Sequence, residues 1–147
     1  MLSYLILFKF YNFTVIQIFF SEWKIDTVIE KIKTINLVPI QYTFDAIFNN
    51  NSPDTHYYRK IFIYNIIAFI PYGTMLPLLF PKINSVKKII LAGFLTSLCY
   101  EIIQIFTTLG AFDIDDIILN TIGTFIGFVV FYFVIHKVLL KNKVILN

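Results

Sequence analysis

Long apolar runs alternate with short polar segments along this chain. Residues 61–80 contain no Asp, Glu, Lys or Arg, residues 89–110 contain only Glu101, and residues 117–136 contain none of the four. A helix needs about 20 consecutive apolar residues to cross the hydrocarbon core of a bilayer. The three runs therefore predict three transmembrane helices, because three such helices are seldom buried together in so short a soluble chain.

A fourth apolar run, residues 2–20, begins the sequence, and its only charged residue is Lys9. A lysine in a span extends its long stem so that the ammonium reaches the interface. A secretory signal would show positive charge before the apolar run and small residues at a cleavage site after it, and neither is present. The sequence therefore predicts an all-α membrane protein, a single domain over residues 1–147 with a bundle of about four transmembrane helices.

The connection between the first two spans, residues 21–59, has a different pattern. Apolar residues stand at positions 25, 28, 29, 32 and 35, which is helical spacing. Polar residues at 49–54 are typical of a loop. We expect an external amphipathic helix lying on the outer membrane interface, followed by a short apolar dip around residues 37–48.

The composition supports a membrane protein. The 147 residues are 58% hydrophobic and 14% charged, whereas a soluble domain is about half apolar and about a quarter charged. The net charge of +3 is spread over the connections and the tail. No basic stripe with stacking aromatics is present, so nucleic acid is not a predicted partner. The single cysteine, Cys99, excludes an internal disulfide.

Lysine and arginine in short connections favour the cytoplasmic side. The second connection and the tail are rich in them (Lys82, Lys87, Lys88, Lys137, Lys141 and Lys143), and the third connection has none. This predicts cytoplasmic termini and an external aspartate loop, residues 110–116. Five cations of the first connection oppose this orientation, because they would lie outside: Lys24, Lys31, Lys33, Arg59 and Lys60.

Polar residues inside the predicted spans share helix faces. Ser97, Glu101, Gln104 and Thr108 are spaced by four, three and four positions. Polar groups in hydrocarbon are costly and usually face a bundle interior or a functional site. Close packing is the simpler interpretation for the small residues Ser97, Thr124 and Gly127, since Gly123-x-x-x-Gly127 is a common helix-packing pattern.

The aspartate loop carries three of the nine acidic residues, Asp113, Asp115 and Asp116. One aspartate, expected to be Asp115 or Asp116, would suffice to cap the fourth span. The excess predicts the rim of an outward-opening polar pocket with Glu101 as its floor. The candidate pocket residues are Arg59, Asn65, Glu101, Gln104, Asp113, Asp115, Asp116 and Asn120. No ligand spacing predicts a metal, although Mg²⁺ or Ca²⁺ would suit carboxylate oxygens at this cluster.

Three motifs in order resemble the VanZ-like family. They are Asn65-x-x-x-Phe69-x-Pro71-x-Gly73, then Glu101-x-x-Gln104, then the run from Phe112 to Gly123; Asn36-Leu37-Val38-Pro39 resembles a further element of that family. The resemblance covers roughly residues 36–130. One departure is Gly110-Ala111, where many members carry an arginine. The resemblance implies a small polytopic protein of the bacterial cytoplasmic membrane, whose namesake is linked to teicoplanin resistance.

Four functions are compatible with these patterns. The favoured one is an accessory or binding protein whose pocket engages a lipid-linked cell-wall precursor, a lipid headgroup or a lipophilic glycopeptide. The alternative is a membrane-embedded enzyme acting on such a lipid, with Glu101 and Asp116 as acid and base. A transporter and a purely structural role are the remaining two. Membrane lipids are the expected partners, and the sequence indicates no oligomeric state.

Overall fold

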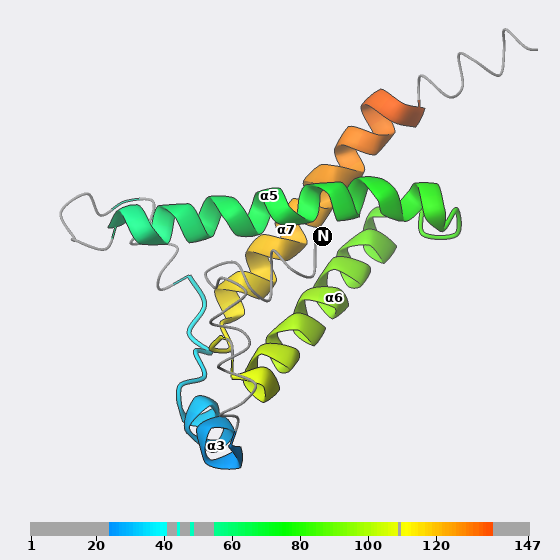
Figure 1. Ribbon diagram of the computed structural model, residues 1–147. Helices are drawn as coiled ribbons and strands as arrows, with labels where there is room; N and C mark the ends of the chain where they lie inside the picture. The colour runs from blue at the N-terminus through cyan, green and yellow to red at the C-terminus, as the bar shows by residue number, and fades with distance from the viewer. Residues whose placement is uncertain (1–23, 41–43, 45–47, 49–54, 109, 137–147) are drawn as a thin grey trace, which may run out of the picture.

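The computed structural model describes residues 24–40, 44, 48, 55–108 and 110–136. The elements, labelled in Figure 1, are α3 (Ile25–Lys33), α5 (Thr55–Leu79), α6 (Val86–Thr107), α7 (Ile114–Val130) and the π-helix η1 (Phe131–His136). Over the described residues there is no strand beyond one isolated bridge, between Asn36 and Asp113. The prediction of an all-α membrane protein is confirmed.

Three helices match the second, third and fourth predicted spans, and each is long and apolar enough to cross a membrane. Their ends differ from the predicted ones. α5 begins at Thr55, well before the apolar run at residue 61, because the polar residues of its first turns are still helical. α6 ends at Thr107, since Thr108 takes a left-handed conformation with φ 53°. The predicted first span, residues 2–20, lies outside the described residues.

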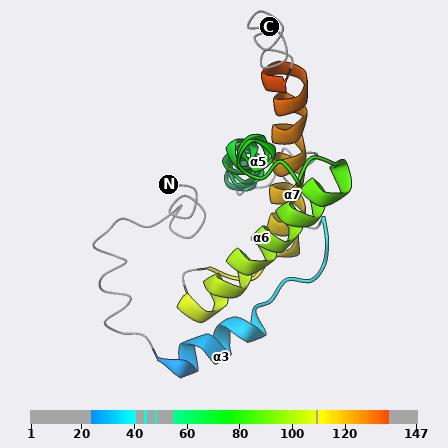
Figure 2. The same ribbon diagram turned by 90° about the vertical axis from the view of Figure 1, so that its right-hand side faces the viewer.

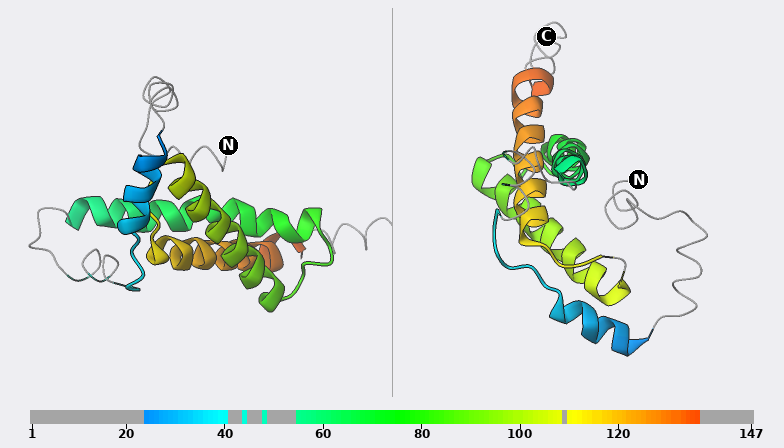
Figure 3. Two further views of the ribbon diagram at one scale, coloured as in Figure 1. Left: turned by 90° about the horizontal axis from the view of Figure 1, so that it is seen from below. Right: turned by 90° about the vertical axis from the view of Figure 1, so that its left-hand side faces the viewer.

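α7 is the central helix of the bundle. It packs along α5 and against α6, whereas α5 and α6 contact each other much less. α5 and α7 start at the same end and run in the same direction (Figures 1 and 3). α6, which lies between them in the sequence, runs in the opposite direction. The aspartate loop therefore lies with the start of α5 at one end, the aspartate end. Lys82, in the α5–α6 connection, marks the opposite, lysine end.

Glycines allow α5 and α7 to approach closely. A Cβ added at Gly123 would overlap the carbonyl oxygen of Ile66, and one at Gly127 would overlap that of Ile70. From the other helix, a Cβ at Gly73 would overlap the carbonyl of Thr124. The predicted packing role of the Gly123-x-x-x-Gly127 pair is therefore confirmed, with the backbone of α5 as its partner.

α3 crosses the direction of α5 and α7 near the aspartate end, where it packs on α6 (Figures 2 and 3). Val28 is buried, whereas Ile25, Ile29 and Ile32 are all exposed on the helix surface. An amphipathic helix with this placement is suited to the membrane interface, as the sequence predicts.

Candidate functional site

Asp113 begins α7 and determines how the helix starts. Its backbone is extended and its side chain accepts a hydrogen bond from the backbone amide of Asp115 at 2.9 Å. This is the N-cap geometry, in which a carboxylate satisfies an amide that the helix leaves unpaired. The prediction that Asp115 or Asp116 caps this helix is therefore wrong, because both residues lie inside its first turn. There they complement the helix dipole.

A segment distant in sequence is fastened to the aspartate loop. This segment, residues 36–40, is here called the strap, and its first residue, Asn36, forms a parallel bridge with Asp113. The Asn36 amide donates to the Phe112 carbonyl at 2.9 Å, and the Ile114 amide donates back to the Asn36 carbonyl at 3.2 Å. The Asn36 side chain also donates to Asp113 Oδ1 at 3.1 Å.

The second anchor of the strap is Asp115. Its Oδ1 accepts from the backbone amide of Ile40 at 2.5 Å. Ile40 has φ 70°, a conformation that a β-branched residue seldom adopts. The bond to Asp115 therefore helps to hold a strained residue in place. The third carboxylate, Asp116, accepts from the side-chain amide of Asn65 on α5.

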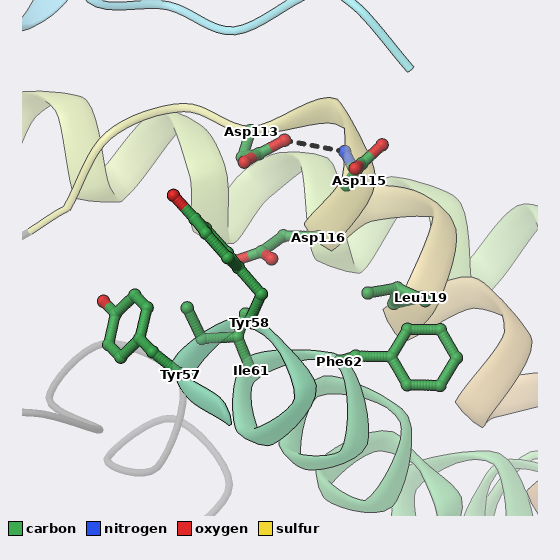
Figure 4. A pocket seen from close by; sticks show the side chains of 8 residues that line it. All are labelled: Tyr57, Tyr58, Ile61, Phe62, Asp113, Asp115, Asp116 and Leu119. Atoms are coloured by element: carbon green, nitrogen blue, oxygen red, sulfur yellow. Dashed lines mark hydrogen bonds between the residues drawn. The ribbon is translucent and has the colours of Figure 1, made fainter. Parts of the chain in front are cut away.

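The three carboxylates line a cavity of about 190 Å³ between the first turns of α5 and α7, here called the acidic cavity. Figure 4 shows the carboxylates on the α7 side and two tyrosines, Tyr57 and Tyr58, on the α5 side. The tyrosine rings meet edge to face with centroids 5.7 Å apart. Ile61, Phe62 and Leu119 complete an apolar lining below them.

The electrostatics of this cavity are centred on Asp113. Its pKa is raised to about 6, chiefly by burial and also by the charges of Asp116 and Asp115, although hydrogen bonds from the Asp115 amide and the Asn36 side chain act in the opposite direction. The carboxylate is therefore close to half-protonated in mildly acidic solution and charged at neutral pH. A cation entering the cavity would favour its charged form.

Glu101 lies next to the cavity without lining it. The side chain is 1% exposed, and its Oε2 accepts from the backbone amide of Asp113 at 2.9 Å. Glu101 therefore supports the aspartate loop from α6, and the floor expected at Glu101 is formed by apolar side chains instead. A carboxylate accepting from a backbone amide also stabilises the turn into α7.

The other predicted pocket residues lie on the three long helices. Asn120 is buried and donates to Ser97 Oγ at 2.8 Å, and its own Oδ1 has no hydrogen-bond partner among the described residues. Gln104 is buried beneath Gly110, where an added Cβ would lie 3.1 Å from the Gln104 side chain. Arg59 is half-buried on α5 and does not line the acidic cavity.

The structure thus brings Asp113, Asp115 and Asp116 together at one cavity and joins Asn65 to it through Asp116. It adds the tyrosines, which the sequence analysis missed because they precede the apolar run. Helical spacing from Tyr58 through Phe62 to Asn65 is the signal that links them to the second span. Within the described ranges, no group of three or more His, Cys, Asp or Glu is arranged to hold a metal ion.

Comparison with known proteins identifies the family. A family model described as VanZ/LLP1 matches residues 1–136. The chain is also similar to "Protein VanZ" of Enterococcus faecium, with 38% identity over 99 residues, which are 62% of this chain. The match spans about 60% of the length of that relative. No solved structure matches. With a match over nearly its whole length, and with the three apolar helices of a membrane protein, the chain belongs to the VanZ/LLP1 family.

Proposed function

We propose that this VanZ-like membrane protein engages an ammonium-bearing group of an envelope molecule in the acidic cavity. The molecule is a lipid-linked cell-wall precursor, a lipid with a cationic headgroup or a lipophilic glycopeptide, and a role in teicoplanin resistance follows from the family resemblance. The proposal places the protein in the bacterial cytoplasmic membrane, with both termini in the cytoplasm and the aspartate loop outside. One observation carries it: three aspartates on the α7 side and two tyrosines on the α5 side line one cavity.

The lining of the cavity suits a cation. An ammonium between carboxylates makes charge-assisted hydrogen bonds, and the face of a tyrosine ring attracts it further. Each aspartate is engaged with a protein amide, but an ionised carboxylate offers about four lone-pair positions. Oxygen sites therefore remain for a ligand at Asp113, whose Oδ1 accepts the hydrogen bonds from the Asp115 amide and the Asn36 side chain.

The size of the cavity limits what enters. Pockets for drug-sized molecules occupy about 300–1,000 Å³, whereas this one has about 190 Å³. Only a fragment of a large lipid or glycopeptide fits, such as an amino group on a short stem. The rest of the molecule would lie over the strap and along the apolar surface of the bundle.

The geometry supports binding more than catalysis. An acid–base pair acting on a bound lipid requires both groups within hydrogen-bond reach of the reacting atoms. Asp116 lines the cavity, but Glu101 is buried behind the backbone of Asp113. The enzymatic alternative with these two residues therefore lacks a shared reaction space.

Removing charge without removing hydrogen bonds tests the proposal. Asp115→Asn and Asp116→Asn keep an acceptor for Ile40 and for Asn65, so both variants should fold. Because they weaken the attraction for a cation, we expect each to reduce teicoplanin tolerance at least severalfold. The measurement is the inhibitory concentration in cells that carry matched membrane levels of each variant.

Glu30→Gln is the matched control, since it removes one exposed carboxylate from α3 away from the cavity. It should leave tolerance unchanged. Wild-type tolerance in both Asp115→Asn and Asp116→Asn would refute a charged binding site and leave the aspartates with their structural hydrogen bonds alone.

A further inference from the structure

A second concave surface lies at the lysine end, far from the acidic cavity. This groove has a volume of about 360 Å³. One wall is the start of α6 with the residues before it, including Ser85 and Val86, and the other wall is the end of α7 and η1. No step of the proposed function uses it.

The second wall of the groove is aromatic and open. It contains Phe125, Phe128, Tyr132 and Phe133, of which Tyr132 and Phe133 are more than half exposed. The Tyr132 and Phe133 rings meet edge to face with centroids 5.6 Å apart. They lie on η1, and π-helical turns are often found at functional sites. A flexible hydrocarbon chain is the ligand that such a wall suits.

Three lysines stand close in sequence to residues 84–86, which form the first wall of the groove. Residues 80–88 contain Lys82, Lys87 and Lys88 and no Asp or Glu, and all three lysines are exposed. Lys88 Nζ donates to the Lys82 carbonyl at 2.7 Å, which brings the Lys88 ammonium beside the backbone of the α5–α6 connection. The charge pattern is therefore complementary to an anion at the mouth of the groove.

The start of α6 adds to this attraction. Ser85 occupies the N-cap position, but its side chain makes no capping hydrogen bond, and the first turn contains no acidic residue. The first amides of a helix point outward and carry partial positive charge, which favours phosphate. The lysines and the start of α6 thus suit an anionic headgroup, and the aromatic groove beside them suits its acyl chain.

We propose that the lysine end binds an anionic glycerophospholipid of the surrounding bilayer. Its phosphate lies against Lys82, Lys87 and the first turn of α6, and one acyl chain lies in the groove along Phe125 and Phe133. This site is separate from the acidic cavity, and it takes the opposite charge.

Lipid competition followed by native mass spectrometry tests the site. The full-length protein is reconstituted with equimolar phosphatidylglycerol and phosphatidylcholine of identical acyl chains, and the lipids retained by each monomer are counted. We expect preferential retention of phosphatidylglycerol. A lysine near an anionic headgroup contributes about fivefold, or about 1 kcal/mol. Lys87→Gln should lower the preference by about fivefold and Lys82→Gln with Lys87→Gln by about 25-fold.

Lys31→Gln with Lys33→Gln on α3 is the matched control, because it removes the same charge at the other end of the molecule. It should leave the preference unchanged. Three results would overturn the proposal: equal retention of both lipids by the wild type, an equal loss in the control, or a dimer that retains no lipid because a second copy covers the groove. The single variant Lys87→Gln keeps the test decisive if the double variant does not fold.

Discussion

Each aspartate of the loop holds a different neighbour. Asp113 caps α7 and binds the Asn36 side chain, Asp115 binds the Ile40 amide, and Asp116 binds Asn65. A capping role for one residue therefore explains only part of the cluster. All three carboxylates also line the acidic cavity. Their hydrogen bonds therefore bear on the folded structure, whereas their charges bear on what the cavity binds.

Asp113 should make stability depend on pH. Its pKa rises from 3.8 to about 6 on folding, chiefly because of burial. The folded state then binds the proton more tightly than the unfolded state, so the stabilising contribution is fully present below pH 3.8 and is lost as pH rises through 6. We expect the melting temperature of the wild type, relative to Asp113→Asn, to fall between about pH 4 and pH 7.

Thermal unfolding in detergent at a series of pH values measures this difference. The variant retains a capping oxygen, so it isolates the titration from the loss of the cap. Asp26→Asn on the exposed surface of α3 is the control and should follow the wild type at every pH. A constant difference between wild type and Asp113→Asn across that range would show that the carboxyl does not titrate there.

At the scale of elements, the glycine contacts of α7 determine how closely the bundle packs. Gly123→Leu should destabilise the protein, because its side chain would meet the backbone of α5, which cannot move aside as a side chain can. Overpacking a close contact costs about 1–3 kcal/mol or more. The measurement is the melting temperature and yield in detergent.

Gly127→Leu should behave in the same way, since it meets the backbone of Ile70. Ile122→Leu is the control. Ile122 lies on the exposed face of the same helix, and the substitution leaves the side-chain volume unchanged. Normal yield and melting for both glycine variants would mean that α5 and α7 are not in backbone contact.

The long helices could be predicted from the sequence, because an apolar run as long as a bilayer is thick is a local signal. Their ends could not, since Thr55 to Lys60 are polar yet continue α5. The strap was also missed as part of the site. Asn36 and Asp113 are separated by 77 positions, and such a contact leaves no periodic trace in either segment. The carboxylates of the cavity were predicted as a cluster, whereas their individual partners required the fold.

At the scale of the whole molecule, the orientation in the membrane is directly testable. In a Cys99→Ser background, Ala111→Cys places a thiol at an exposed position of the aspartate loop. We expect an impermeant thiol reagent to label it in intact cells, because the short α5–α6 connection at the opposite end carries Lys82, Lys87 and Lys88, whereas the aspartate loop carries no Lys or Arg.

Lys82→Cys is the control at the lysine end, where the position is also exposed. It should react only after the cells are lysed. The reverse pattern would place the acidic cavity on the cytoplasmic side and exclude ligands that reach the membrane from outside.

The strap also determines when this protein can be completed during biosynthesis. A chain synthesised at about 5–20 residues per second delivers Asp113 roughly 4–15 s after Asn36, given their separation of 77 positions. Over that interval the strap has been synthesised but the aspartate loop has not. The backbone groups of residues 36–40 therefore lack the hydrogen-bond partners that the loop later provides. Translation arrest before α7 would leave a nascent chain in which the strap lacks the aspartate loop that holds it.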